Sequence, residues 1–115
     1  MPQFDRLEHT HGTLIIEDRI VEMDASFELV EMGRADDVEL QCCGTLTSRK
    51  HARLEYRRRR FILTDQNANG TFVNPNDLEP ITLKRDYCTL GESGLICLDE
   101  ALGQNDPFAI SYRCR

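Results

Sequence analysis

The sequence predicts an all-β domain, a sandwich or barrel of short strands, on the basis of three observations. Apolar and polar residues alternate in short stretches such as Ala52-Leu54-Tyr56, which is the two-residue period of a half-buried strand. Turn-forming residues recur every several positions along the chain. No stretch has the periodicity of a helix longer than one or two turns. The length of 115 residues, 40% of them apolar, fits one globular domain.

Eleven segments are predicted to be strands, and turn chemistry separates them. In chain order they are Thr13–Glu17, Arg19–Met23, Phe27–Glu31, Val38–Gln41, His51–Tyr56, Phe61–Thr64, Thr71–Val73, Ile81–Leu83, Tyr87–Leu90, Gly94–Leu98 and Phe108–Tyr112. Residues that favour turns lie between them, at Glu17-Asp18, Met32-Gly33, Ala35-Asp36-Asp37, Asn67-Ala68-Asn69-Gly70, Asn74-Pro75-Asn76-Asp77 and Glu92-Ser93-Gly94. The acidic segment Asp99–Pro107 is predicted to hold a short helix or an open loop.

The N-terminal residues 1–12 are polar, and we expect a flexible segment there, followed by a folded domain of residues 13–115. His9 and His11 would place both imidazoles on one face of a strand, but two histidines without a third ligand do not define a metal site. We therefore expect no metal and no cofactor. The first residues lack the apolar core of a secretory signal, and no apolar run could span a membrane.

Five cysteines, at positions 42, 43, 88, 97 and 114, cannot all pair within one molecule, and their spacing contains no CxxC. This pattern predicts reduced, buried thiols in a cytoplasmic protein rather than a disulfide scaffold or a zinc site. We expect no membrane partner.

The net charge of -6 argues against a general nucleic-acid binder, but the charge is unevenly spread. Seven of the fourteen Lys and Arg lie between Arg49 and Arg60 with the single carboxylate Glu55, so this segment carries +6 and the remaining chain -12. Such a concentration indicates a local anion site on a surface that otherwise repels anions. For the run Arg57–Arg60 itself, we favour a solvated hairpin tip over a ligand site.

Three predicted loops carry the donors that a doubly charged oxyanion needs. They contain Gly33-Arg34, Ser48-Arg49-Lys50-His51 and Asp65–Thr71, and so offer guanidinium groups, a hydroxyl and side-chain amides. No acid/base pair, nucleophile elbow or phosphate-binding P-loop accompanies them. The sequence thus predicts a binding module rather than an enzyme.

These motifs resemble the forkhead-associated (FHA) domain, whose hallmark is a GR, an SxxH and an NG in this order. The matching residues are Gly33-Arg34, Ser48–His51 and Asn69-Gly70, within a resemblance that runs from about Phe27 to Leu98. Leu54–Gln66, Leu83–Leu98 and the closing Ile110–Cys114 resemble, more narrowly, FHA modules attached to bacterial class III adenylate/guanylate cyclases. The resemblance implies an eleven-stranded β-sandwich whose loops at one end bind phosphothreonine peptides.

The resemblance also implies a role for each matching residue. Arg34, Ser48 and Arg49 would bind the phosphate, and Asn69 would hold the main chain of the peptide. His51 would pack inward and brace the binding loop through hydrogen bonds, while Gly33 and Gly70 would relieve clashes that a Cβ would cause. The rim would include Lys50, Asn67 and Ala68, of which Lys50 contributes long-range attraction.

The sequence departs from the family pattern just before Asn69-Gly70. The family usually has Ser followed by Thr or Ser, whereas this chain has Asn67 and Ala68, and Ala68 has no hydroxyl for the phosphate. A hydrogen bond to a charged group is worth about 1.5–3 kcal/mol, so we expect a weakened site, not an abolished one. The expected partner is a phosphothreonine-containing protein or neighbouring domain in bacterial signalling, with phosphorylation-independent docking as the alternative.

Overall fold

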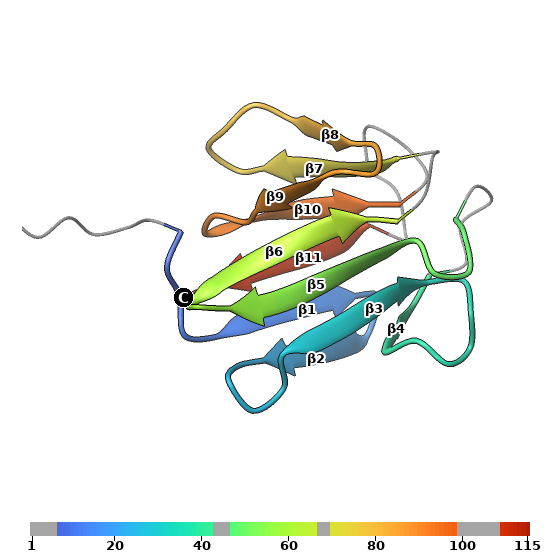
Figure 1. The fold of residues 1–115 in the computed structure, drawn as a ribbon, viewed down its shortest axis with the longest axis horizontal. Helices are drawn as coiled ribbons and strands as arrows, with labels where there is room; N and C mark the ends of the chain where they lie inside the picture. The colour runs from blue at the N-terminus through green and yellow to red at the C-terminus, as the bar shows by residue number, and fades with distance from the viewer. Residues whose placement is uncertain (1–6, 43–46, 67–69, 99–108) are drawn as a thin grey trace, which may run out of the picture.

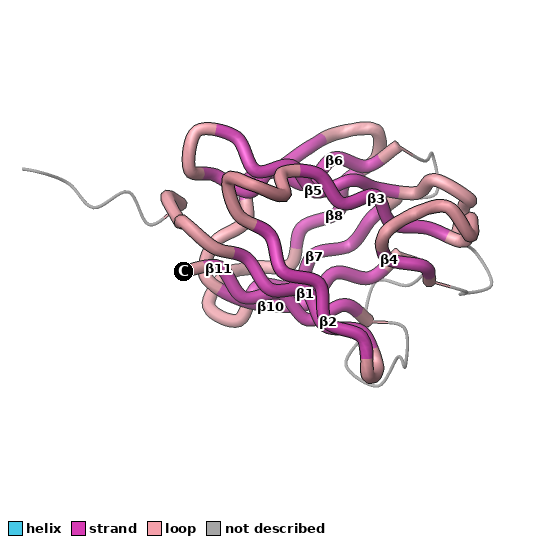
Figure 2. The backbone as a smooth tube through the Cα atoms, turned by 90° about the horizontal axis from the view of Figure 1, so that it is seen from below, coloured by secondary structure: helices cyan, strands magenta, loops and turns pink. Residues whose placement is uncertain are grey.

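The fold is a sandwich of two β-sheets, which confirms the predicted all-β class. A computed structural model describes residues 7–42, 47–66, 70–98 and 109–115, and these residues form eleven strands and no helix (Figure 1). One sheet has six strands in the order β2-β1-β11-β10-β7-β8, and the other has five in the order β4-β3-β5-β6-β9. Figure 2 shows the layer of β3, β5 and β6 lying over the layer of β1, β2, β10 and β11.

The eleven strands follow the predicted order along the chain. They are β1 (Gly12–Ile16), β2 (Arg19–Met23), β3 (Leu29–Gly33), β4 (Leu40–Gln41), β5 (Ala52–Arg57), β6 (Arg60–Asp65), β7 (Thr71–Pro75), β8 (Ile81–Leu83), β9 (Tyr87–Thr89), β10 (Ser93–Cys97) and β11 (Ile110–Cys114). All neighbours in the sheets are antiparallel except β3 and β4, which pair in parallel.

Nine strands differ from their predicted bounds by one or two residues at one or both ends. Met32-Gly33 and Asn74-Pro75, predicted as turns, belong to β3 and β7 because they pair with β4 and β10. Two further differences also follow from pairing. β11 continues to Cys114, two residues further than expected, because it pairs with β1 as far as Gly12. β4 is only two residues long. Just before β4, the carboxylate of Glu39 accepts the main-chain N–H of Glu31 at 2.7 Å. This N–H is therefore not available for a main-chain hydrogen bond to a longer β4. The predicted loop or helix at Asp99–Pro107 lies outside the described residues.

The core fills the space between the two sheets and follows the predicted alternation. Ala52, Leu54 and Tyr56 on β5 are all buried, with half-buried residues between them. The largest fully buried side chains come from both sheets: Leu14, Ile16, Met23, Met32, Leu40, Leu54, Phe61, Leu63, Leu90, Ile96, Ile110 and Tyr112. Burial of this apolar surface is the main free-energy term that holds the sheets together.

The described cysteines are thiols, not disulfides, in or beside this core. Cys42, Cys97 and Cys114 are buried and Cys88 is partly buried; Cys43 lies outside the described residues. Burial raises the pKa of Cys114 to about 12, and burial together with the carboxylate of Asp86 raises that of Cys88 to about 11. These two thiols therefore stay protonated at neutral pH and are poor nucleophiles.

The stretch before β1 packs against the sandwich, although we expected it to fray. The main-chain N–H of His9 donates to Arg59 at 2.7 Å, and the N–H groups of Thr10 and His11 both donate to the Arg115 carbonyl at 2.8 Å. The His9 side chain is buried beside Phe61. These contacts join residues 9–11 to the end of the sandwich where β5 meets β6.

This packing makes His9 a source of pH-dependent stability. Burial lowers the pKa of His9 below its ordinary 6.5, with a smaller opposing effect of Glu92. The unfolded chain therefore takes up the His9 proton at a higher pH than the folded chain does. We expect the contribution of His9 to stability to be constant above pH 7 and to fall as the pH drops through about 6.5.

Urea unfolding at a series of pH values, compared with His9→Phe, tests this expectation. Phenylalanine keeps the ring against Phe61, and among the described residues His9 Nε2 has no hydrogen-bond partner that the substitution would strand. The wild type should lose stability relative to His9→Phe only on the acidic side. Parallel stability curves for the two proteins would contradict it.

Candidate functional site

The described residues of the three loops singled out from the sequence lie at one end of the sandwich. β3 ends at Gly33, β5 begins after His51, and β7 begins after Gly70, so all three loops leave the sheets on the same side (Figure 1). The main-chain N–H of Arg34 donates to Ser48 at 2.8 Å, and that of Ala35 donates to Arg49 at 3.0 Å. The structure therefore brings Arg34 next to Ser48 and Arg49.

Gly33 permits this close approach of the two loops. A Cβ built on Gly33 would lie 2.1 Å from the carbonyl oxygen of Arg49 and 2.7 Å from that of Ser48. Both obstacles are backbone atoms, so no side chain can rotate away to make room. Gly70 has a different reason to be glycine, because its φ of +97° is one that L-residues rarely adopt.

His51 joins the loop before β5 to the loop before β7. Its side chain is fully buried, its Nδ1 accepts the main-chain N–H of Ser48 at 3.0 Å, and its Nε2 lies 2.7 Å from the carbonyl oxygen of Gly70. Because Nδ1 is an acceptor here, Nε2 carries the proton and donates to Gly70. One imidazole thus fixes both the Ser48 backbone and the residue after Asn69.

The buried carboxylate of Asp65 extends this network, and the sequence motifs did not predict this role. The two side-chain oxygens of Asp65 accept from the hydroxyl of Thr71 at 2.6 Å and from the main-chain N–H of Arg85 at 2.7 Å. Its Oδ1 also lies 3.9 Å from His51 Nε2. The start of β7 and the turn after β8 are thereby held in place beside the loops. The sequence signal was weak, since Asp65 sits among other polar loop residues.

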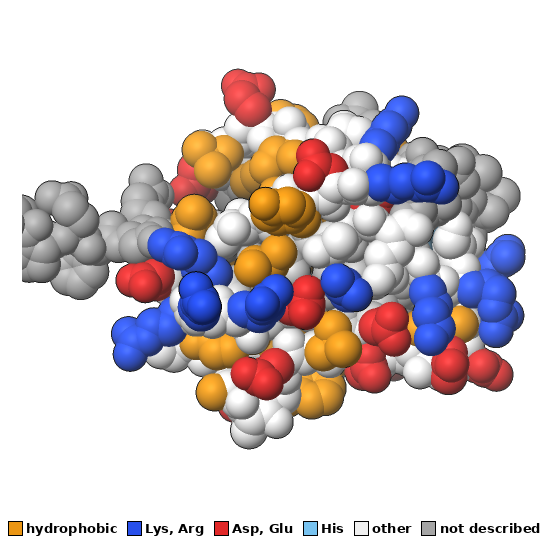
Figure 3. Space-filling model, viewed as in Figure 1, with side chains coloured by type: hydrophobic (Ala, Val, Ile, Leu, Met, Phe, Trp, Pro, Cys, Tyr) orange, Lys and Arg blue, Asp and Glu red, His pale blue; other side chains and the backbone are white. Residues whose placement is uncertain are grey.

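The charged side chains expected to bind phosphate lie on the surface of this end. Arg34 and Arg49 are exposed and Ser48 is half-buried. Neither guanidinium forms an ion pair with a carboxylate of the described residues. Lys50 is also exposed, with its Nζ 3.9 Å from Glu31 Oε1. Figure 3 shows Lys and Arg side chains gathered at the right-hand edge of the face, near these loops. Asn67, Ala68 and Asn69 lie outside the described residues.

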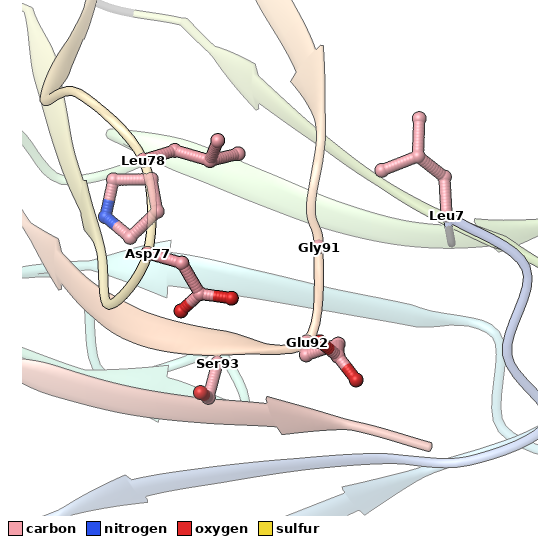
Figure 4. A pocket seen from close by; sticks show the side chains of 7 residues that line it. Leu7, Asp77, Leu78, Gly91, Glu92 and Ser93 are labelled. Carbon is pink, nitrogen blue, oxygen red and sulfur yellow. The ribbon is translucent and has the colours of Figure 1, made fainter.

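A cavity at the opposite end of the sandwich has the wrong chemistry for phosphate. It measures about 170 Å³ and lies between the end of β7 and the start of β10. Figure 4 shows Asp77, Leu78 and Glu92 beside it, so its charged groups are carboxylates and the rest of its wall is largely apolar. This cavity therefore lacks the cationic donors that a phosphate needs, whereas the loop end carries Arg34 and Arg49.

The described residues give no support for metal binding. They contain no group of three or more His, Cys, Asp or Glu side chains that could hold a metal ion. Of the two histidines in the His9-x-His11 pair, His11 contacts the carboxylate of Glu22 at 2.8 Å and His9 packs beside Phe61. The described residues contain no helix long and apolar enough to cross a membrane.

Comparison with known proteins identifies the family. The sequence profile of the FHA domain matches residues 30–87, half of the chain. This chain belongs to the FHA domain family. The matched segment contains Arg34, Ser48, His51 and Gly70, the residues that the geometry above brings to one end of this FHA domain. A search of curated protein sequences finds no match.

Solved FHA domains share the fold at low sequence identity. The FHA-1 domain of Mycobacterium tuberculosis Rv1747 is 18% identical, with a TM-score of 0.65 over 92% of this chain and 97% of that one. The FhaA FHA domain, solved with the intracellular domain of Rv3910, is 24% identical, with a TM-score of 0.63 over 89% and 99%. The MEK1 FHA domain, solved with a HOP1 phosphothreonine peptide, is 20% identical, with a TM-score of 0.67 over 90% and 96%.

The position of His51 leads to a prediction about stability. We expect His51→Ala to lower the free energy of unfolding by about 2 kcal/mol, because it strands the Ser48 N–H and the Gly70 carbonyl in a buried site. Loss of peptide binding should follow as a consequence of the loosened loops. Thermal melting beside a binding titration measures both effects, with His11→Ala as the control at a partly exposed histidine. Normal melting with abolished binding would show that His51 contacts the ligand itself.

Proposed function

We propose that this FHA domain is a non-catalytic module that binds phosphothreonine peptides through Arg34, Ser48, Arg49 and Asn69. The observation that carries the proposal is the pair of exposed guanidinium groups, unpaired within the described residues, on loops joined by Arg34 N–H···Ser48 and Ala35 N–H···Arg49 hydrogen bonds. The half-buried Ser48 hydroxyl belongs to the same loop as Arg49. Family membership and the phosphothreonine peptide bound to the MEK1 FHA domain support the same reading.

The mechanism is electrostatic recognition on a preformed surface. A phosphothreonine brings about -1.5 to -2 charges at neutral pH and three acceptor oxygens. Arg34 and Arg49 supply compensating charge with paired N–H donors, which suit phosphate geometry better than an ammonium does. Ser48 adds a neutral donor, and the His51 and Asp65 contacts hold the loops in place before the peptide arrives. Binding then costs little loop ordering.

A titration with an oriented phosphothreonine peptide library, matched by its non-phosphorylated and phosphoserine counterparts, tests the proposal. We expect measurable affinity only for phosphorylated peptides and a preference for phosphothreonine. Equal affinity for the phosphorylated and non-phosphorylated libraries would overturn it.

Equal affinity for phosphorylated and non-phosphorylated peptides would correspond to an alternative function, phosphorylation-independent docking. One sequence feature favours this alternative. Ala68 lacks the hydroxyl that the family usually places two residues before the glycine of its NG motif. A site that has lost one phosphate contact can serve as a phosphorylation-independent docking surface for a partner or neighbouring domain.

We further propose that the module acts in the cytoplasm of a bacterium and regulates an adenylate/guanylate cyclase. This rests on the resemblance of Leu54–Gln66 and Leu83–Leu98 to FHA modules attached to such cyclases. Cyclase turnover measured with and without the phosphopeptide that binds best would test it, on the protein in which this domain naturally occurs. An unchanged rate would exclude regulation through this site.

A further inference from the structure

The turn between β5 and β6 has an unusual combination of residue type and backbone conformation. Arg57 pairs with Arg60 across the hairpin, so the connection consists of Arg58 and Arg59 alone. Both have positive φ, at 51° and 67°. Two-residue hairpin turns with two positive φ values are type I′, which strongly prefer Asn-Gly or Asp-Gly. The sequence places arginine at both positions instead.

The backbone gives no reason for these arginines. A side chain with a Cβ is strained in the left-handed region, and only glycine, asparagine and aspartate adopt it readily. The turn therefore forms in spite of its central residues. Such strain persists where the surroundings enforce it, and it is found most often at functional positions. Glu17 and Arg85 also have positive φ, so strain alone assigns no function to Arg58 and Arg59, and the second observation is the exposed charge of their side chains.

The surroundings hold this turn in place. The carbonyl of Arg59 accepts the main-chain N–H of His9 at 2.7 Å, and the hydroxyl of Tyr56 donates to the His9 carbonyl at 2.6 Å. The Tyr56 and Phe61 rings pack with centroids 4.7 Å apart directly behind the turn. The guanidinium groups thus extend from a fixed base, which lowers the entropy cost of binding a ligand.

The turn carries a cluster of exposed positive charge. Arg57, Arg58 and Arg59 are exposed, and none of them forms an ion pair with a carboxylate in the described part of the chain. They lie at the end of the sandwich opposite the loops of Arg34 and Ser48 (Figure 1). Figure 3 shows Lys and Arg side chains clustered around this turn on the left of the face. Outside residues 49–60 the chain carries -12, so this is a second and separate concentration of positive charge.

A groove beside the turn indicates which anion fits. It is open, measures about 630 Å³, and is lined by Thr10, Ser26 and Tyr56 in addition to Arg58 and Arg59. Asp24 and Glu28 lie in the same groove. A nucleic-acid strand has a negative charge on every nucleotide, and an anionic bilayer is a uniform surface, so both would meet these carboxylates. A polypeptide can place acidic side chains against the arginines and neutral groups against Asp24 and Glu28.

We propose that the turn formed by Arg57, Arg58 and Arg59 is a second binding site that docks an acidic polypeptide segment of a partner protein. Arginine suits this partner because its planar fork binds a carboxylate with two parallel hydrogen bonds. The site is independent of the phosphopeptide loops and uses none of their residues.

The double variant Arg58→Asn with Arg59→Gly tests the site without endangering the fold. It installs the preferred type I′ sequence, so it should raise the melting temperature while removing two positive charges. Glu17→Gly is the matched control, since Glu17 also has a positive φ, of 52°, in the two-residue turn between β1 and β2. Arg34→Ala is the second control, because it removes an arginine from the other end.

The probe is a short end-capped peptide in which glutamate alternates with serine, and its counterpart with glutamine in place of glutamate. We expect the glutamate peptide alone to bind the wild type, more weakly at higher salt. The Arg58→Asn, Arg59→Gly variant should bind it about tenfold more weakly. Arg34→Ala and Glu17→Gly should bind it as the wild type does. The turn variant should keep the phosphopeptide affinity of the wild type. The two titrations therefore test the acidic-peptide site at the turn and the phosphopeptide site separately.

Two further ligands decide the class of partner. Vesicles containing phosphatidylserine and a single-stranded oligonucleotide should bind the wild type less well than the glutamate peptide does. Tighter binding of either one would overturn the assignment to a polypeptide. Equal binding of the glutamate peptide by the wild type and the turn variant, or no binding by the wild type, would overturn the site itself.

Discussion

Arg34→Ala is expected to lower the affinity for a phosphothreonine peptide by about two orders of magnitude and to leave the fold intact. Truncating one partner of a close, hydrogen-bonded charge pair costs about 2–5 kcal/mol, much of it from leaving the phosphate charge unmatched. The side chain of Arg34 is exposed and outside the core, and its structural contribution is made by its main-chain N–H to Ser48. Alanine keeps that N–H, so melting should change little.

A calorimetric titration with one phosphopeptide, together with thermal melting of the same samples, measures both parts of this result. Arg113→Ala is the matched control, because it removes an exposed arginine from β11, a strand of the other sheet. Arg34→Lys separates charge from geometry, because an ammonium keeps the charge but loses the paired donors. The affinity of Arg34→Lys should therefore fall between that of the wild type and that of Arg34→Ala. A folded Arg34→Ala protein with unchanged affinity would place the phosphate elsewhere.

The parts of the fold that local sequence determines could be predicted. Alternation at Ala52, Leu54 and Tyr56 identifies β5 because one face of the strand is buried and the other meets solvent. The turn at Arg58-Arg59 is the exception among these local features. Four arginines in a row predict a solvated tip, but only the register of Arg57 with Arg60 shows that two of them occupy strained positions.

The SxxH motif predicts that His51 braces the loop, but other contacts that order the candidate site join residues far apart in the chain, and no local pattern could reveal these. Asp65 holds the backbone of Arg85, twenty residues later in the turn after β8. The burial of His9 likewise depends on the carbonyl of Arg59, fifty residues later. The motifs indicated which loops carry the chemistry, whereas the distances within and between these loops come from the packing of the two sheets.

Gly33→Ala should cost more stability than any other single substitution considered above. The added Cβ would lie 2.1 Å from the Arg49 carbonyl oxygen and 2.7 Å from both the Arg49 carbonyl carbon and the Ser48 carbonyl oxygen. To reach ordinary contact the Ser48–Arg49 backbone must retreat by roughly 1 Å or more. That movement breaks or stretches the hydrogen bonds from Arg34 and Ala35, so we expect a loss of about 4 kcal/mol in the free energy of unfolding.

The same displacement separates Arg34 from Ser48 and Arg49, the residues proposed to bind phosphate. Gly33→Ala should therefore also weaken phosphopeptide binding by at least about tenfold in whatever fraction remains folded. Gly91→Ala is the matched control, since a Cβ there meets nothing within 4 Å and its φ is not in the left-handed region. Urea unfolding of both variants, followed by titration at a temperature where both are folded, separates stability from affinity. If Gly33→Ala proves as stable and binds as tightly as Gly91→Ala, the close approach of the two loops is not what holds Arg34 beside Ser48 and Arg49.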